Sequence, residues 1–232
     1  MRLDRFISHT TGLPRSRAKA AIISKRVSID GTVVRDAATI VNAAQLVRLD
    51  DQDLVWPRDY YLMLHKPTGV VCSTEDPINT PVHQLVDERW AKDLHAAGRL
   101  DADSTGLVLL TTDGAWSHRI TSPRHHCEKR YVVTVEQPLD DTFVSRFAEG
   151  LVLNDDPAPT FPAQLEILAP HQAQVTLREG RYHQIRRMFA ACGNHVVTLH
   201  RERIGPITLD DSLEPGQWRE LSAEEVESLR HA

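Results

Sequence analysis

Apolar positions follow helical spacing at the start of the chain and then switch to alternation. Leu3, Phe6 and Ile7 lie on one face of a first predicted helix, and a second helix is predicted after the Gly12-Leu13-Pro14 break. Alternation then begins, with Asp30-Gly31 between two β-rich pieces, which indicates a hairpin. The predicted elements after the break are a helix over 15–23, a hairpin over 27–34 and a strand over 46–49. The polar stretches 50–53 and 57–59 are predicted to form a linker.

From Tyr60 onward the pattern predicts strands mixed with helices in irregular order. The predicted strands cover 60–64, 106–111, 131–136, 163–168, 174–177 and 195–200, and the predicted helices cover 142–149 and 183–191. A last helix begins at the capping-box sequence Ser222-Ala223-Glu224-Glu225. Because strands and helices do not alternate regularly, an α+β fold with a mixed sheet is favoured over a doubly wound one. We expect two domains, 1–56 and 60–232.

Charge is distributed unevenly along the 232 residues, whose net charge is −5. The first 35 residues carry eight Lys or Arg against two acidic residues, so a basic module precedes an acidic body. Such a cluster can neutralise RNA phosphates, although a solvated helix face is the alternative. The candidate RNA-binding residues are Arg2, Arg5, Arg15, Arg17, Lys19, Lys25 and Arg26.

The sequence contains no signal for a membrane, a secretory leader or a disulfide framework. Its three cysteines are widely separated and form no CxxC pair, and no apolar run approaches the length of a membrane span. We therefore expect a cytoplasmic protein with reduced thiols and no structural zinc cluster.

The stretch Gly98 to Leu107, GRLDADSTGL, places two carboxylates beside an arginine and before an apolar strand. A calcium loop would need a bidentate Glu at its twelfth position, but Thr112 stands there. A simple surface turn would explain the glycines but not Arg99 or the carboxylates. A carboxylate beside a buried strand requires a partner, and Arg186 or Arg187 of the predicted helix 183–191 could supply it. The spacing does not decide between these two arginines.

Several blocks resemble two known families. Lys25 to Gly31, after a basic helix, resembles the S4 RNA-binding domain. GRLDADSTGL resembles the catalytic motif of the pseudouridine synthases, and the chain as a whole resembles their RsuA/RluB/RluE/RluF branch, especially the bacterial RsuA type that acts on 16S rRNA. The other blocks that carry this resemblance are 64–73, 116–129, 180–189 and 193–197.

The resemblance implies roles for individual residues. Asp101 would be the catalytic carboxylate, Tyr131 would stack on the target base and Arg186 would pair with Asp101. Leu199 would line the base pocket. Basic residues would hold the RNA on either side of the target uridine. The alternative is that they belong to a solvated loop with no role in binding. The candidate substrate-binding residues besides Leu199 are Arg99, His118, Arg119, Arg124, Lys129 and Arg130. Our preferred role for Asp103 is structural, as an acceptor of backbone hydrogen bonds within the loop.

The implied reaction is the isomerisation of uridine to pseudouridine, by resemblance at position 516 of 16S rRNA. It requires no cofactor and no metal, and the sequence contains neither a Walker loop nor a dinucleotide fingerprint. Asp101 could act as a nucleophile or as a base. The expected partner is rRNA, free or within a small-subunit assembly intermediate, with no membrane and with the protein a monomer. The alternatives are a large-subunit (23S) rRNA synthase of the same branch and a non-catalytic S4-type assembly factor.

Overall fold

The computed structural model describes residues 1–56, 58–73, 76, 78–88, 90–154 and 156–230. The chain forms two compact units, Met1–Arg58 and Asp59–Ala232. Pro57 of the predicted linker lies outside the described residues. No helix among the described residues is long and apolar enough to cross a membrane.

The first unit packs two helices against a small sheet. Its helices are α1 (Leu3–Thr11) and α2 (Arg15–Ile23), and its strands are β1 (Val27–Ile29), β2 (Thr32–Val33), β3 (Val47–Leu49) and β4 (Gln52–Leu54), in the sheet order β2-β1-β3-β4. Its core includes Leu3, Phe6 and Ile22. The predicted linker over 50–53 was therefore wrong, since β4 pairs antiparallel with β3. Asp50 and Asp51 both adopt positive φ and form the tight turn that joins β3 to β4.

A buried carboxylate ties the start of α1 to the start of α2. The Asp4 side chain is fully buried, and it accepts from Arg2 and, at 3.1 Å, from Arg15. Hydrogen bonds from Arg2 hold the pKa of Asp4 well below its usual range, against the effect of burial, and Arg15 adds to the lowering. Two of the seven candidate RNA-binding residues are thus engaged inside the unit.

Asp4→Asn is expected to lower the free energy of unfolding of this unit by about 1–3 kcal/mol at neutral pH. Because the folded-state pKa of Asp4 is lowered, its contribution is complete above the unfolded pKa of about 3.9 and is lost as pH falls through the folded value. Urea titrations followed by the NMR signals of Phe6 and Trp56 should show the wild-type advantage shrinking below about pH 4. Exposed Asp51 is the matched control, and Asp51→Asn should change stability by less than about 0.5 kcal/mol. An advantage that persists undiminished at pH 2 would contradict this role of Asp4.

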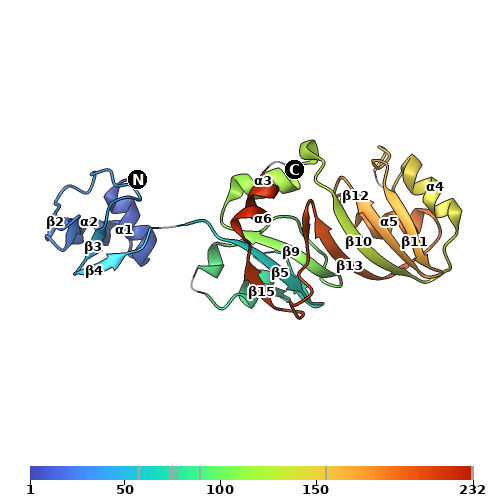
Figure 1. Cartoon of the computed structure of the whole chain (residues 1–232), viewed down its shortest axis with the longest axis horizontal. Coiled ribbons are helices and arrows are strands. Elements are labelled where there is room, and N and C mark those ends of the chain that lie inside the picture. Colours follow the sequence, from blue (N-terminus) through green and yellow to red (C-terminus); the bar gives the residue numbers. More distant parts are fainter. Residues whose placement is uncertain (57, 74–75, 77, 89, 155, 231–232) are drawn as a thin grey trace. The chain divides into compact units, whose positions relative to one another are not determined.

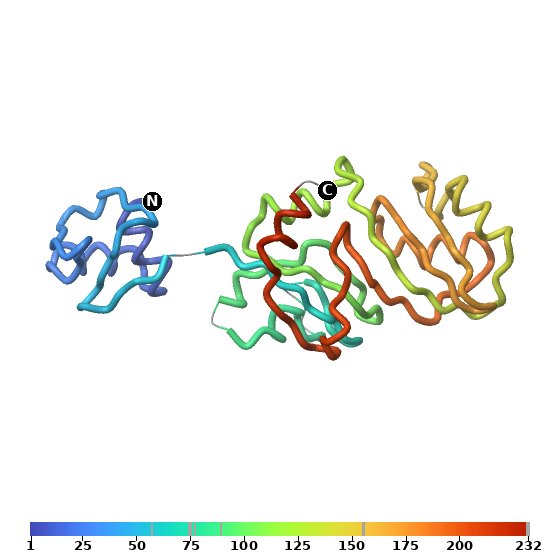
Figure 2. Tube along the Cα trace, in the orientation of Figure 1, coloured from blue at the N-terminus to red at the C-terminus, as the bar shows by residue number. Residues whose placement is uncertain are grey.

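The second unit is built on a mixed sheet, which confirms the α+β expectation (Figure 1). Its main path runs β11-β12-β10-β13-β9-β5-β15, with β8 beside β9 and β14 beside β13. The strands are β5 (Tyr61–Lys66), β8 (His95–Ala96), β9 (Thr105–Thr111), β10 (Lys129–Val135), β11 (Gln164–Ala169), β12 (Gln172–Leu177), β13 (Val196–Ile204), β14 (Ile207–Thr208) and β15 (Trp218–Glu220). A separate pair joins β6 (Val70–Val71) and β7 (Thr80–Pro81). The C-terminal segment returns to place β15 antiparallel to β5 (Figure 2).

Helices cover the two halves of this sheet separately (Figure 1). The helices are α3 (Gly114–Thr121), α4 (Asp141–Glu149), α5 (Gln184–Ala191) and α6 (Ala223–Ser228), with short 3₁₀ turns at Val82–Leu85, Ala91–Asp93 and Pro123–His125. Phe147 of α4 and Phe189 of α5 pack on β10, β12 and β13, whereas Trp116 of α3 and Leu229, just after α6, pack on the β5–β9 half. The predicted capping box of α6 is confirmed. Helix α3 was not predicted, although Asp113 caps it.

The two halves meet where β9 and β13 run parallel, and their register is His200 with Thr105 and Arg201 with Gly106. Gly106 has φ +106°, and a Cβ there would overlap the Arg201 carbonyl oxygen and lie 2.7 Å from its backbone nitrogen. Only glycine allows this close approach. Gly106 thus joins the halves immediately after the segment that contains Asp101.

Candidate active site

Asp101 lies in the turn that leads into β9, at the junction between the two halves of the sheet. Its side chain is 32% exposed, so the carboxylate is partly shielded yet reachable from solvent. The turn closes on itself, since the Ser104 amide donates to the Asp101 carbonyl oxygen at 3.1 Å. The Gly69 amide donates to the carbonyl of Ala102 at 2.8 Å. The backbone at Asp101 and just after it is therefore held in place.

Two basic side chains from α5 and its N-cap contact the two oxygens of this carboxylate. His183 Nε2 lies 3.3 Å from Asp101 Oδ1, and Arg186 Nε lies 4.0 Å from Oδ2. Arg187 turns away and donates to the carbonyl oxygens of Tyr182 and Asn154. The geometry thus brings Arg186, and not Arg187, to Asp101. The contact from His183 was not predicted.

Asp103 differs from the structural role that we expected. Its side chain is 68% exposed and pairs with Arg186 at 2.9 Å, closer than Arg186 comes to Asp101. The hydroxyl of Ser104 also donates a weak hydrogen bond to the Asp103 carboxylate, at 3.4 Å. Among the described residues, this carboxylate accepts no hydrogen bond from a backbone amide. Asp103 therefore anchors Arg186 beside Asp101.

Two buried cations, which the sequence did not point to, hold the loop through carbonyl oxygens. Lys66 is fully buried, and its ammonium donates to Ser104 at 2.7 Å and to Ala102 at 3.4 Å, beside its bond to Pro67. Burial lowers the pKa of Lys66, while the carboxylates of Asp101 and Asp103 act in the opposite direction.

Arg201 of β13 performs the matching task on the other side of Asp101. It is 2% exposed and donates to the carbonyl oxygens of Leu107 at 2.8 Å, Gly98 at 3.0 Å and Arg99 at 3.2 Å. Its planar guanidinium presents donors in a fixed fork, so one side chain fastens three carbonyl oxygens of the chain on both sides of the turn. A lysine inside an apolar strand and an arginine two residues after Leu199 were the only sequence signals for this pair.

Tyr131 and Leu199 lie on the same face of the sheet as Arg201. In the antiparallel pair β10–β13, Tyr131 faces Arg201 and Val133 faces Leu199, so these side chains share one side. Tyr131 is half-buried, and Leu199 is 6% exposed in the core of its half of the sheet. Because Arg201 reaches the Gly98–Arg99 backbone from this face, Tyr131 and Leu199 lie on the side where Asp101 is held.

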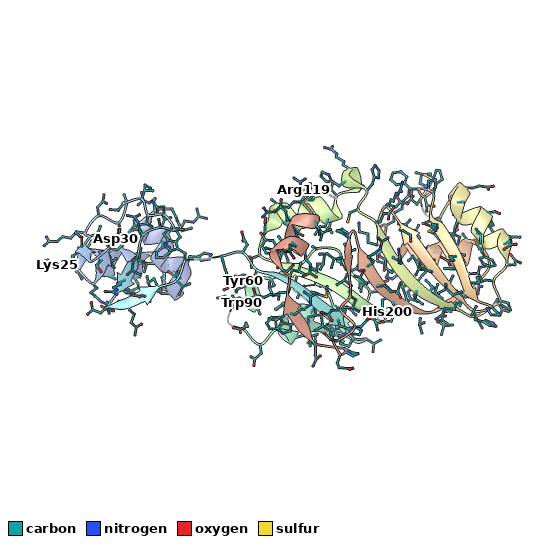
Figure 3. The ribbon with its side chains drawn as sticks, viewed as in Figure 1. Lys25, Asp30, Tyr60, Trp90, Arg119 and His200 are labelled. Atoms are coloured by element: carbon teal, nitrogen blue, oxygen red, sulfur yellow. The ribbon has the colours of Figure 1, made fainter. Side chains whose placement is uncertain are left out.

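The predicted substrate-binding residues do not form one exposed group. Arg99, His118, Arg119 and Arg124 are exposed, with Arg119 on α3 (Figure 3). Lys129 is buried, and its ammonium donates to the Ile120 carbonyl oxygen at 3.1 Å, so it is not placed to hold RNA. Burial also lowers the pKa of Lys129. It is buried because β10 lies inside the sheet between β12 and β13, which the charged run Glu128-Lys129-Arg130 did not reveal.

The basic residues of the first unit divide into paired and unpaired groups. Arg2 and Arg15 pair with Asp4, and Arg26 pairs with Asp50. The four other candidates are exposed and, in the part of the chain that the structure describes, make no ion pair: Arg5, Arg17, Lys19 and Lys25. Lys25 points outward from the unit (Figure 3). These four are the residues of this surface whose charge is most available to a phosphate.

Comparisons with known proteins agree with this architecture. Residues 60–191 match the model of the RNA pseudouridylate synthase family, and residues 1–47 match the S4 domain. The chain is 53% identical to the ribosomal small subunit pseudouridine synthase A of Yersinia pestis, covering 99% of this chain and 98% of that protein. It is also 53% identical to the protein of that name from Escherichia coli K12, covering 99% and 100%. A crystal structure of a pseudouridylate synthase matches with a TM-score of 0.72 and 48% identity, covering 99% of both chains.

A unit built on a mixed sheet, preceded along the chain by a small basic unit, is the architecture of a pseudouridine synthase with an RNA-binding module. The chain belongs to the RNA pseudouridylate synthase family, in the RsuA-type branch that carries an N-terminal S4 domain, and the resemblance found in the sequence is confirmed.

Proposed function

We propose that the protein isomerises one uridine of small-subunit (16S) rRNA, at position 516, to pseudouridine, with Asp101 as the catalytic carboxylate and without a cofactor. The observation that supports this most directly is the placement of Asp101 between His183 and Arg186 at the seam of the sheet. The names of the full-length relatives support the choice of the small subunit.

The reaction breaks the bond between the sugar C1′ and N1 of the base, turns the base and joins C1′ to C5. The proton on C5 is lost, and N1 gains one, so the isomerisation is balanced without an oxidant or a reductant. Asp101 supplies what each route requires, either an oxygen that attacks the sugar or a base that removes a sugar proton. Its carboxylate also stabilises positive charge that develops on the sugar. Arg186 places positive charge beside this carboxylate, and the His183 imidazole lies against its other oxygen.

The target uridine must leave its stack to reach a carboxylate at a sheet seam. Tyr131 offers a ring on the face where Asp101 is held, and Leu199 contributes apolar surface beside it. We assign Tyr131 to stacking on the flipped base and Leu199 to the wall of its pocket. Exposed Arg99, His118, Arg119 and Arg124 provide positive charge for the flanking strand.

The S4 domain is expected to supply salt-dependent affinity for RNA. Replacing Arg17, Lys19 and Lys25 together with Gln should weaken binding and reduce the slope of log K against log salt by about 0.7–0.9 for each lost phosphate contact. Removal of Met1 to Trp56 should weaken binding further while the remaining unit keeps its circular-dichroism spectrum. Filter binding at several salt concentrations measures both effects. An unchanged affinity and slope in the truncated protein would refute this role of the S4 domain.

The proposed reaction is tested with the purified chain and RNA carrying tritium at C5 of uridine, because pseudouridine formation releases that proton. Release from 16S rRNA or a small-subunit assembly intermediate, stopping at one equivalent per RNA, is the expected result. Release only from 23S rRNA would identify a large-subunit synthase. RNA binding without any release would identify a non-catalytic assembly factor.

A further inference from the structure

Beside His183, which contacts Asp101, an aromatic side chain is exposed to solvent. Tyr182 is 75% exposed, well above the 41% exposure of Phe161. Its ring stacks on that of His183, with centroids 3.9 Å apart and planes inclined by 17°. Since His183 covers one face of the Tyr182 ring, the opposite face is the one available to a ligand.

The ring pair is coupled to the site by geometry. His183 has φ 47°, a left-handed conformation that begins α5 and directs its imidazole to Asp101 at 3.3 Å. One ring therefore contacts the carboxylate and the next ring extends outward from it. A nucleotide chain that delivers a base to Asp101 must pass close to this pair.

The backbone of Tyr182 is anchored on both sides. Arg181 pairs with Asp156 at 2.8 Å and with Glu179 at 3.0 Å, and it also donates to two carbonyl oxygens. Arg187 donates to the Tyr182 carbonyl oxygen at 3.3 Å. A ring on a fixed backbone loses little conformational freedom when a ligand stacks on it. These contacts preorganise the exposed ring of Tyr182 for stacking.

We propose that the Tyr182–His183 ring pair is a stacking platform for the nucleobase that adjoins the target uridine in the RNA. This rests on the proposed function, because flipping one base leaves its neighbour without a stacking partner. Aromatic side chains that stack on bases supply affinity for single-stranded RNA with little sequence preference. Tyr131 is half-buried on the sheet and serves the target base, so the two tyrosines have separate tasks.

Kinetics with the full chain and a 16S rRNA fragment test the platform. Stacking of one base contributes about 1–3 kcal/mol, so Tyr182→Ala should raise KM roughly 5- to 140-fold and change kcat much less. Tyr182→Phe keeps the ring and should keep a KM within about twofold of the wild type. An exposed residue of this kind can be replaced with little effect on folding, which a melting curve checks. A KM unchanged by Tyr182→Ala would overturn the proposal, and so would an equal rise in both variants.

A fluorescent base locates the contact. With 2-aminopurine in place of the nucleotide on either side of the target uridine, binding of the wild type and of Tyr182→Phe should quench the probe at one of the two positions. The Tyr182→Ala variant should not quench it. Quenching that survives in Tyr182→Ala would overturn the platform even if the enzyme is active. Failure of the proposed function is a different result, namely no tritium release by the wild-type protein.

Discussion

Asp101→Asn is expected to abolish pseudouridine formation while the protein continues to bind RNA. Asn has the size of Asp but neither the charge nor the basic oxygen, so it can neither attack the sugar nor remove a proton. Removing a positioned acid, base or nucleophile costs at least about 10²–10⁴-fold in rate. Binding should persist because the exposed basic residues of the S4 domain are unchanged.

The measurement is tritium release under single-turnover conditions, with RNA binding measured in parallel. Asp103→Asn is the matched control, because Asp103 is close in sequence, 68% exposed and paired with Arg186. It should lower the rate far less than Asp101→Asn does, since its task is to hold Arg186. Equal losses in the two variants would mean that the assignment of chemistry to Asp101 alone is wrong.

Gly106→Ala is expected to have the largest effect on stability. An added Cβ would overlap the Arg201 backbone across the parallel pair β9–β13, and φ +106° is unfavourable for any residue with a Cβ. Backbone atoms on a neighbouring strand cannot rotate away, so the strands must separate at the seam that joins the two halves of the sheet. We expect a loss of more than about 3 kcal/mol in the free energy of unfolding, or failure to fold.

Urea denaturation and the yield of folded protein measure this loss. Gly193→Ala is the control, because Gly193 has φ +80° but a Cβ there would meet nothing within 4 Å. It should cost only about 1–2 kcal/mol, the strain of the left-handed conformation without the overlap. A Gly106→Ala protein as stable as the Gly193→Ala protein would show that the close approach of β9 and β13 is not required.

Much of the fold could be predicted from the periodic spacing of apolar residues along the chain. Helix α1 was expected from its apolar spacing, and α2, α4, α5 and most of the long strands were predicted close to their observed bounds, although β13 continues four residues beyond its predicted end. The short strands β1 and β2 were predicted because the Asp30-Gly31 turn marks them, and β3 was predicted as well. The equally short β4, β8 and β15 have no such signal, and so few residues show no period. The family resemblance was carried by several blocks in order, and the comparisons confirm it.

The site was only partly predictable. The sequence led to Asp101 and to a choice between Arg186 and Arg187, but which arginine reaches the carboxylate depends on the phase of α5 against a distant turn. Lys66 and Arg201 escaped notice because their partners are carbonyl oxygens, which every residue has and no motif encodes. Lys129 was misjudged for the related reason that a charge count does not tell which face of a strand a side chain occupies.

The central claim is tested most directly by mapping pseudouridines in the rRNA of cells that lack this protein. The account predicts loss of one pseudouridine in 16S rRNA, at position 516, with 23S rRNA unchanged. The wild-type gene should restore it, and a gene encoding Asp101→Asn, expressed to the same level, should not. Retention of every pseudouridine in the deleted strain, or restoration by Asp101→Asn, would contradict the account.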